Sequence, residues 1–166
     1  HQAKRVSKAI LVSAVVPYML QTDDNPKGTP QAVFDDLLDG IKADRPKFFT
    51  EFFKDFYGVS MLSHPVSPEC LTWTQTMAMQ ASLRATLACV KAFSSTDFRP
   101  DLAHFSVPTL IIHGTKDKTV PIEAAGRAAA AQLPQATFIE YEDAPHGLIA
   151  THRARLIDDL LKFLWA

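Results

Sequence analysis

Residues 107–121 read VPTLIIHGTKDKTVP. A short apolar run ends at a glycine and is followed three residues later by an aspartate. The run is opened by Pro108 and closed by Gly114, which is typical of a central parallel strand buried on both faces. Asp117 follows the C-terminal end of this predicted strand. Ligands of open α/β sheets bind at the carboxyl ends of the strands, so Asp117 is a candidate functional residue. The alternative is that Asp117 only caps the helix that follows.

A second stretch places a histidine at the same edge of the predicted sheet. Residues 137–142 read TFIEYE and predict another strand, which leads into a loop that contains His146. The alanine-rich segment 122–133 predicts the crossover helix between the two strands. We therefore expect Asp117 and His146 on neighbouring loops, where the carboxylate would fix the tautomer of the histidine and stabilise its imidazolium form. Such a pair is the acid–base part of a nucleophilic triad, whereas a lone loop histidine is usually only solvated.

Four segments of the sequence resemble a single enzyme family. They are residues 4–20 (KRVSKAILVSAVVPYML), 93–114 (FSSTDFRPDLAHFSVPTLIIHG), 113–123 (HGTKDKTVPIE) and 143–147 (DAPHG). Together they look like α/β-hydrolases, and more closely like the non-haem haloperoxidase group with its arylesterases and perhydrolases. The resemblance runs over nearly the whole chain. It implies that Asp117 is the triad acid and that His146 is the triad base.

The nucleophile of that family is absent from the sequence. α/β-Hydrolases carry it in a G-x-S-x-G elbow, in the chain order serine, acid, histidine. None of the six glycines begins such a motif, and the nearest stretch, GVSML at residues 58–62, lacks the second glycine. By the resemblance, the chain opens where the helix after the nucleophile would be ending. We therefore expect the N-terminal half of the fold, with the serine and the oxyanion donors, to lie outside this chain.

The expected fold class is α/β: the C-terminal portion of an α/β-hydrolase fold, with parallel strands, flanking helices and an inserted helical cap. Residues 1–17 would contribute a core strand at 9–16, apolar and buried on both faces. Residues 18–95 would form the cap, and residues 96–166 would return to the core with the acid and histidine loops. Four helix starts are predicted in the cap, at Thr29-Pro30, Pro46, Ser67-Pro68 and Ser82. A last amphipathic helix is expected over residues 150–165.

Three further residues are candidates for substrate binding. Tyr18 follows the first predicted strand, at a position that lines the pocket mouth in the resembling enzymes, although it would equally pack under the cap. Thr119 and Val120 are next to the predicted acid and are expected to help line an acyl pocket. Phenylalanines at 48, 49, 52, 53 and 56 would form plain core, with some members facing a cavity.

Composition excludes several classes of function. Lys and Arg total 17 and Asp and Glu total 18, so there is no basic surplus for binding nucleic acid. No window approaches the length of an apolar membrane span, and these residues contain no signal-like segment, which leaves open a signal upstream of them. The six histidines show no metal-binding spacing, and no glycine-rich phosphate motif occurs, so we expect neither a metal nor a cofactor. The two cysteines, Cys70 and Cys89, are expected to be reduced, buried thiols in a cytoplasmic protein.

The leading hypothesis is a serine ester hydrolase of which this chain supplies the Asp-His half. The resemblance implies a small ester or carboxylic acid substrate and a perhydrolase side activity that needs no haem. The partner would be the N-terminal half, as a cleaved or separate polypeptide or as the remainder of one long chain. The oligomeric state stays open, and a homo-oligomer is one option. The alternative function is a truncated, non-catalytic binding module that uses its cap cavity.

Overall fold

The computed structural model describes residues 5–166, which include a three-stranded parallel sheet. Its strands are β1 (Ala9–Val12), β2 (Thr109–Gly114) and β3 (Thr137–Tyr141), in the spatial order β1-β2-β3. Ala9 pairs with Thr109, and Leu110 pairs with Thr137. Every residue of β2 is buried, which confirms the central strand predicted from its apolar sequence.

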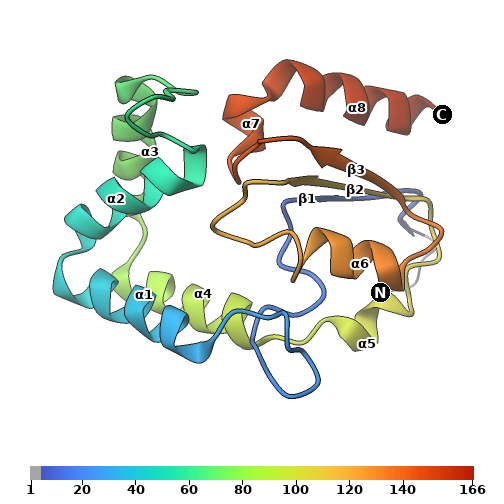
Figure 1. Cartoon of the computed structure of the whole chain (residues 1–166), viewed down its shortest axis with the longest axis horizontal. Helices are drawn as coiled ribbons and strands as arrows, with labels where there is room; N and C mark the ends of the chain where they lie inside the picture. Colours follow the sequence, from blue (N-terminus) through green and yellow to red (C-terminus); the bar gives the residue numbers. More distant parts are fainter. Residues whose placement is uncertain (1–4) are drawn as a thin grey trace.

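Helices cover both faces of this sheet (Figure 1). They are α5 (Arg99–Leu102), α6 (Gly126–Gln132), α7 (Leu148–Thr151) and α8 (Arg153–Trp165). On one face, Leu110 and Ile112 pack with Leu156 of α8. On the other face, Ile111 packs with Ala129 of α6. Alternate side chains of β2 thus pack into two separate apolar layers, one on each face of the sheet, as expected for a strand between helices.

Four further helices, of 13 residues each, lie beside the carboxyl end of the sheet (Figure 1). They are α1 (Gln31–Ala43), α2 (Arg45–Tyr57), α3 (Pro68–Gln80) and α4 (Leu83–Ser95). The side chains of Ser67 and Ser82 accept hydrogen bonds from the backbone N–H groups of Cys70 and Ala85, so both predicted caps are present. We refer to residues 31–95 as the four-helix segment.

The four-helix segment joins the sheet through an apolar cluster. Met19, Phe34 and Val120 are all at least 97% buried and pack together, with relative exposures of 1%, 2% and 3%. Phe34 belongs to α1, whereas Val120 belongs to the loop after β2. This cluster fixes α1 against the loop that carries Asp117.

Several predicted boundaries are wrong in detail. The first strand ends at Val12 instead of residue 16, because Ser13 has a positive φ of 46° that extended backbone does not adopt. Its residues are only partly buried, whereas the apolar run predicted burial on both faces. Thr29 does not cap α1, whose N-cap is Pro30 without a side-chain bond. The crossover helix begins at Gly126 after a turn, not at residue 122.

The last predicted helix is also divided. His152, with φ −127° and ψ 29°, separates α7 from α8, so the segment 150–165 is not one continuous helix. The predicted first domain, residues 1–17, includes residues 1–4, which lie outside the described residues. Over residues 5–166, no helix is long and apolar enough to cross a membrane.

Candidate active site

Asp117 lies in a tight loop that β2 leads into. Gly114 ends the strand so close to the neighbouring loop that a Cβ there would lie 2.2 Å from the carbonyl oxygen of Ala144. The backbone N–H of Lys116 donates to that same carbonyl at 3.0 Å. Only glycine permits this approach, and it brings the loop after β2 against the loop after β3.

The carboxylate of Asp117 is held by hydrogen bonds on both oxygens. Its side chain is 0% exposed. Oδ1 accepts from the backbone N–H groups of Thr119 and Val120, at 2.9 and 2.7 Å. Oδ2 lies 2.7 Å from Nδ1 of His146 and 3.2 Å from Nε2 of His113. The group is therefore buried and fully partnered, as a buried charge requires.

These contacts keep the carboxylate ionised. Burial by itself raises the pKa of Asp117, but the hydrogen bonds from His113 and His146 outweigh that effect. The net result is a pKa below the ordinary value for an aspartate. A carboxylate in this state accepts hydrogen bonds and does not donate them.

His146 has the tautomer that a general base needs. Because ionised Asp117 can only accept, the 2.7 Å contact places the proton on Nδ1 of His146. Nε2 is then unprotonated, and no hydrogen bond within residues 5–166 occupies it. The side chain is 18% exposed, so the ring is held yet reachable. The contact that the sequence predicted between Asp117 and His146 is present.

Helix α2 ends directly against the histidine loop. The carbonyl of Phe56 accepts from the N–H of Gly147 at 2.8 Å. The Phe56 ring meets the His146 ring edge-on, with 4.6 Å between their centroids. A Cβ on Gly147 would lie 2.4 Å from the ring of Tyr57. The phenylalanine-rich helix is thus largely core, as predicted, while Phe56 faces the candidate base.

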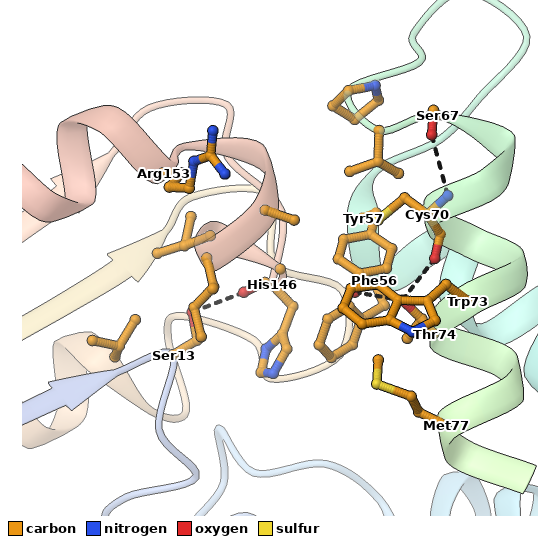
Figure 2. A pocket seen from close by; sticks show the side chains of 17 residues that line it. Ser13, Phe56, Tyr57, Ser67, Cys70, Trp73, Thr74, Met77, His146 and Arg153 are labelled. Carbon is orange, nitrogen blue, oxygen red and sulfur yellow. Dashed lines mark hydrogen bonds between the residues drawn. The ribbon is translucent and has the colours of Figure 1, made fainter.

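A pocket of about 700 Å³ opens beside His146. Trp73 and Met77 of α3 face the histidine across it, and Phe56 lies between them (Figure 2). Ser13 lies on the opposite wall, where its hydroxyl donates to the carbonyl oxygen of His146 at 3.2 Å. That bond engages the backbone of His146 and not its ring. The walls are mainly apolar, which suits an uncharged organic group.

The three predicted substrate-binding residues do not line this pocket. Tyr18 is partly buried, and the guanidinium carbon of Arg99 lies over its ring, 5.0 Å from the ring centroid. Thr119 and Val120 contact Asp117 through their backbone N–H groups. Their structural role is to hold the acid, and their contact with substrate remains a prediction.

The described residues show no sign of a metal centre. Within residues 5–166, no group of three or more histidine, cysteine or acidic side chains is placed to hold a metal ion. Cys70 and Cys89 are both free, but Cys70 is only partly buried and Cys89 is exposed, so the predicted burial of the two thiols is wrong.

Comparison with known proteins identifies the family. A family model described as the alpha/beta hydrolase fold matches residues 1–152. This chain belongs to the α/β-hydrolase family. Its fold class is therefore the predicted one: parallel strands of an α/β-hydrolase with flanking helices.

Within the family, the chain groups with haloperoxidases and esterases. A non-heme chloroperoxidase of Streptomyces lividans is 40% identical, over 96% of this chain and 58% of the relative. A bifunctional esterase/perhydrolase of Acinetobacter calcoaceticus is 37% identical over the same shares. The crystal structure of a bromoperoxidase from Bacillus anthracis superposes with a TM-score of 0.92 at 37% identity, covering 96% of this chain and 58% of that one. The chain thus spans less than two thirds of the length of these relatives.

Sequence reasoning missed two contacts of this α/β-hydrolase site. His113 is one of the six histidines whose spacing indicates no metal site, and its contact with Asp117 is not predicted by the sequence. His113 is the penultimate residue of β2, the strand that leads into the loop of Asp117. That position in the sequence could have indicated a contact between the two side chains. Ser13 was assigned to the middle of a strand, and no feature of the sequence indicated its positive φ.

Proposed function

We propose that this chain supplies the acid and base of a Ser-His-Asp triad in an ester hydrolase, with perhydrolysis as a side activity. The observation that carries the proposal is the 2.7 Å contact between Nδ1 of His146 and buried Oδ2 of Asp117, beside an apolar pocket. Relatives named as an esterase/perhydrolase and as chloroperoxidases support the same chemistry. The substrate would be a small ester or carboxylic acid.

The proposed reaction runs through an acyl-enzyme. Nε2 of His146 takes the proton of the nucleophilic serine, which attacks the ester carbonyl, and then returns that proton to the leaving alcohol. Asp117 keeps the imidazole in the required tautomer and stabilises the imidazolium that forms. Water then attacks the acyl-enzyme, with His146 again acting as the base. Hydrogen peroxide in place of water would release a peracid, which oxidises halide afterwards without any cofactor.

The nucleophile would come from a polypeptide segment outside these residues. The sequence has no G-x-S-x-G elbow. The buried pair alone also lacks an oxyanion hole, which usually supplies a large share of the rate of acyl transfer. We propose the N-terminal portion of the same hydrolase as that partner. The four-helix segment would serve as the cap over its active site, with Tyr18, Thr119 and Val120 as further candidates for contact with substrate.

The proposal is tested by hydrolysis of a nitrophenyl acetate ester. The chain is assayed alone, with the nucleophile-bearing portion, and with that portion as the His146→Gln variant. We expect turnover only for the wild-type pair. His104→Gln, which replaces an exposed histidine distant in sequence from the pair, serves as the control and should keep full activity.

A second candidate is a binding module without catalysis. Met61 and Leu62 are 95% and 99% exposed in the loop between α2 and α3, which is an unusual display of apolar surface. We call this chain combined with the nucleophile-bearing portion the joined protein. The second candidate predicts that the joined protein binds small apolar esters but does not hydrolyse them. Turnover that depends on His146 would exclude it.

A further inference from the structure

Asp117 has one contact that the triad does not use. The triad needs one oxygen of the acid for His146, and backbone N–H groups already occupy the other. His113 nevertheless lies with Nε2 3.2 Å from Oδ2, the oxygen that His146 also contacts. Its side chain is 1% exposed, so the contact is fully removed from water.

A second contact shows that Nε2 of His113 carries a proton. Nε2 is 2.8 Å from the carbonyl oxygen of Val120. A carbonyl oxygen only accepts, so Nε2 must carry a proton and donate it. Oδ2 of Asp117 lies near the same nitrogen, within reach of the positive end of that N–H dipole. His113 is therefore a hydrogen-bond donor that lies between the carboxylate of Asp117 and the carbonyl of Val120, in the loop that carries Asp117.

The result is a closed set of contacts around the acid. Val120 accepts from His113 through its carbonyl and donates to Oδ1 of Asp117 through its N–H. His113 belongs to β2, the central strand of the described sheet, whereas Val120 belongs to the loop. The imidazole thus ties the acid loop back to the most buried strand.

We propose that His113 is a positioning residue that aims Oδ2 of Asp117 at His146. The inference rests on the proposed function, since it assigns a role within that triad. A histidine whose only task was to fill the core would satisfy its N–H on Val120 and would not need to lie beside the carboxylate. The 3.2 Å approach to the oxygen shared with His146 is what distinguishes the two roles.

Helix α6 is shaped around this imidazole. A Cβ on Gly126 would lie 2.8 Å from Cβ and 3.0 Å from Nδ1 of His113. Real side chains do not approach so closely, so a glycine at the first position of α6 lets the ring sit at its observed place. The ring is therefore confined between the helix and the acid loop, with little freedom to turn.

The test uses a matched pair of variants in the joined protein. His113→Gln keeps an N–H donor close to the position of Nε2, whereas His113→Met has similar length without a donor. Both variants lack the imidazole ring, so a difference between them reports the N–H donor that contacts Val120 and Asp117. We expect kcat/KM to be about ten- to a hundredfold lower for the methionine variant than for the glutamine variant.

Histidine ¹⁵N spectra measure the protonation of Nδ1 of His146, which a purely structural role of His113 in the core would not change. We expect the Nδ1–H signal of His146 in the wild type and in His113→Gln, and its loss in His113→Met. Equal kcat/KM and equal His146 signals in the two variants would overturn the inference. If neither variant folds, the wild-type spectrum decides, because an Nε2 of His113 that carries no proton would contradict the contact with Val120. A wild type without the Nδ1–H signal of His146 would instead refute the proposed function itself.

Discussion

At the scale of single residues, Asp117 is the best-supported part of the site. It is buried, ionised and contacted by two histidines and two backbone N–H groups. Its place after a strand was readable from the sequence, and so was its pairing with His146. The contact with His113 was not, because the sequence does not show which way a strand side chain points relative to a loop.

Asp117→Asn should remove activity without unfolding the protein. The amide has nearly the shape of the carboxylate, but it cannot stabilise the imidazolium and would favour the wrong tautomer of His146. We expect kcat of the joined protein to fall by roughly three to four orders of magnitude. Circular dichroism close to that of the wild type would establish that the loss is chemical. A loss of less than tenfold would argue against a triad.

The same carboxylate should make stability depend on pH. Its pKa is lowered in the folded state, so the unfolded state binds the proton more readily. The contribution of Asp117 to the free energy of unfolding is therefore complete above the ordinary pKa of 3.8 and is lost as the pH falls through the lower folded value. Urea unfolding of the joined protein between pH 7 and pH 3 should show a steeper decline for the wild type than for Asp117→Asn. Parallel declines would mean that the pKa is not lowered.

At the scale of elements, helix starts were the most predictable feature. Ser67 and Ser82 cap their helices as the sequence indicated, because a serine before a helical period has a direct physical role. Strand ends were less predictable. Val15 and Val16 are apolar and suit a strand, yet the backbone turns away at Ser13. Such a turn is set by tertiary contacts, here the bond from Ser13 to the histidine loop.

The close approach of the loops that carry Asp117 and His146 should make Gly114 intolerant of a side chain. A Cβ there would meet backbone, 2.2 Å from the carbonyl oxygen of Ala144, and backbone cannot move aside cheaply. We expect Gly114→Ala to lower the free energy of unfolding by about 3 kcal/mol and to displace His146.

Gly40→Ala is the matched control for that substitution. Its Cβ would meet only the ring of Phe48, at 2.9 Å, and alanine favours helix α1. We expect the free energy of unfolding of the joined protein to change by less than about 1 kcal/mol, measured by urea unfolding. Equal effects of the two substitutions would show that the loops are not in tight contact.

At the scale of the whole molecule, the parallel sheet explains why a partner is expected. Within residues 5–166, β1 pairs only with β2, and its residues are partly exposed. An open strand edge with apolar flanks is prone to aggregate. The family could be predicted from motifs spread along the chain, whereas the arrangement of the four-helix segment around His146 could not.

The chain on its own should be inactive and poorly soluble, and joining it to the nucleophile-bearing portion should restore both properties. The contact area should resemble that of obligate partners, about 2,000 Å² or more in total. Size-exclusion chromatography with and without that portion checks the expectation. A monodisperse, active monomer of this chain alone would contradict it.

The most direct test of the central claim is mass spectrometry of the joined protein after reaction with a serine-directed phosphonate. The claim is that Asp117 and His146 activate a serine that lies outside these residues. We predict one adduct, carried by the nucleophile-bearing portion and abolished by His146→Gln. An adduct on residues 1–166, or labelling that persists in His146→Gln, would contradict the account.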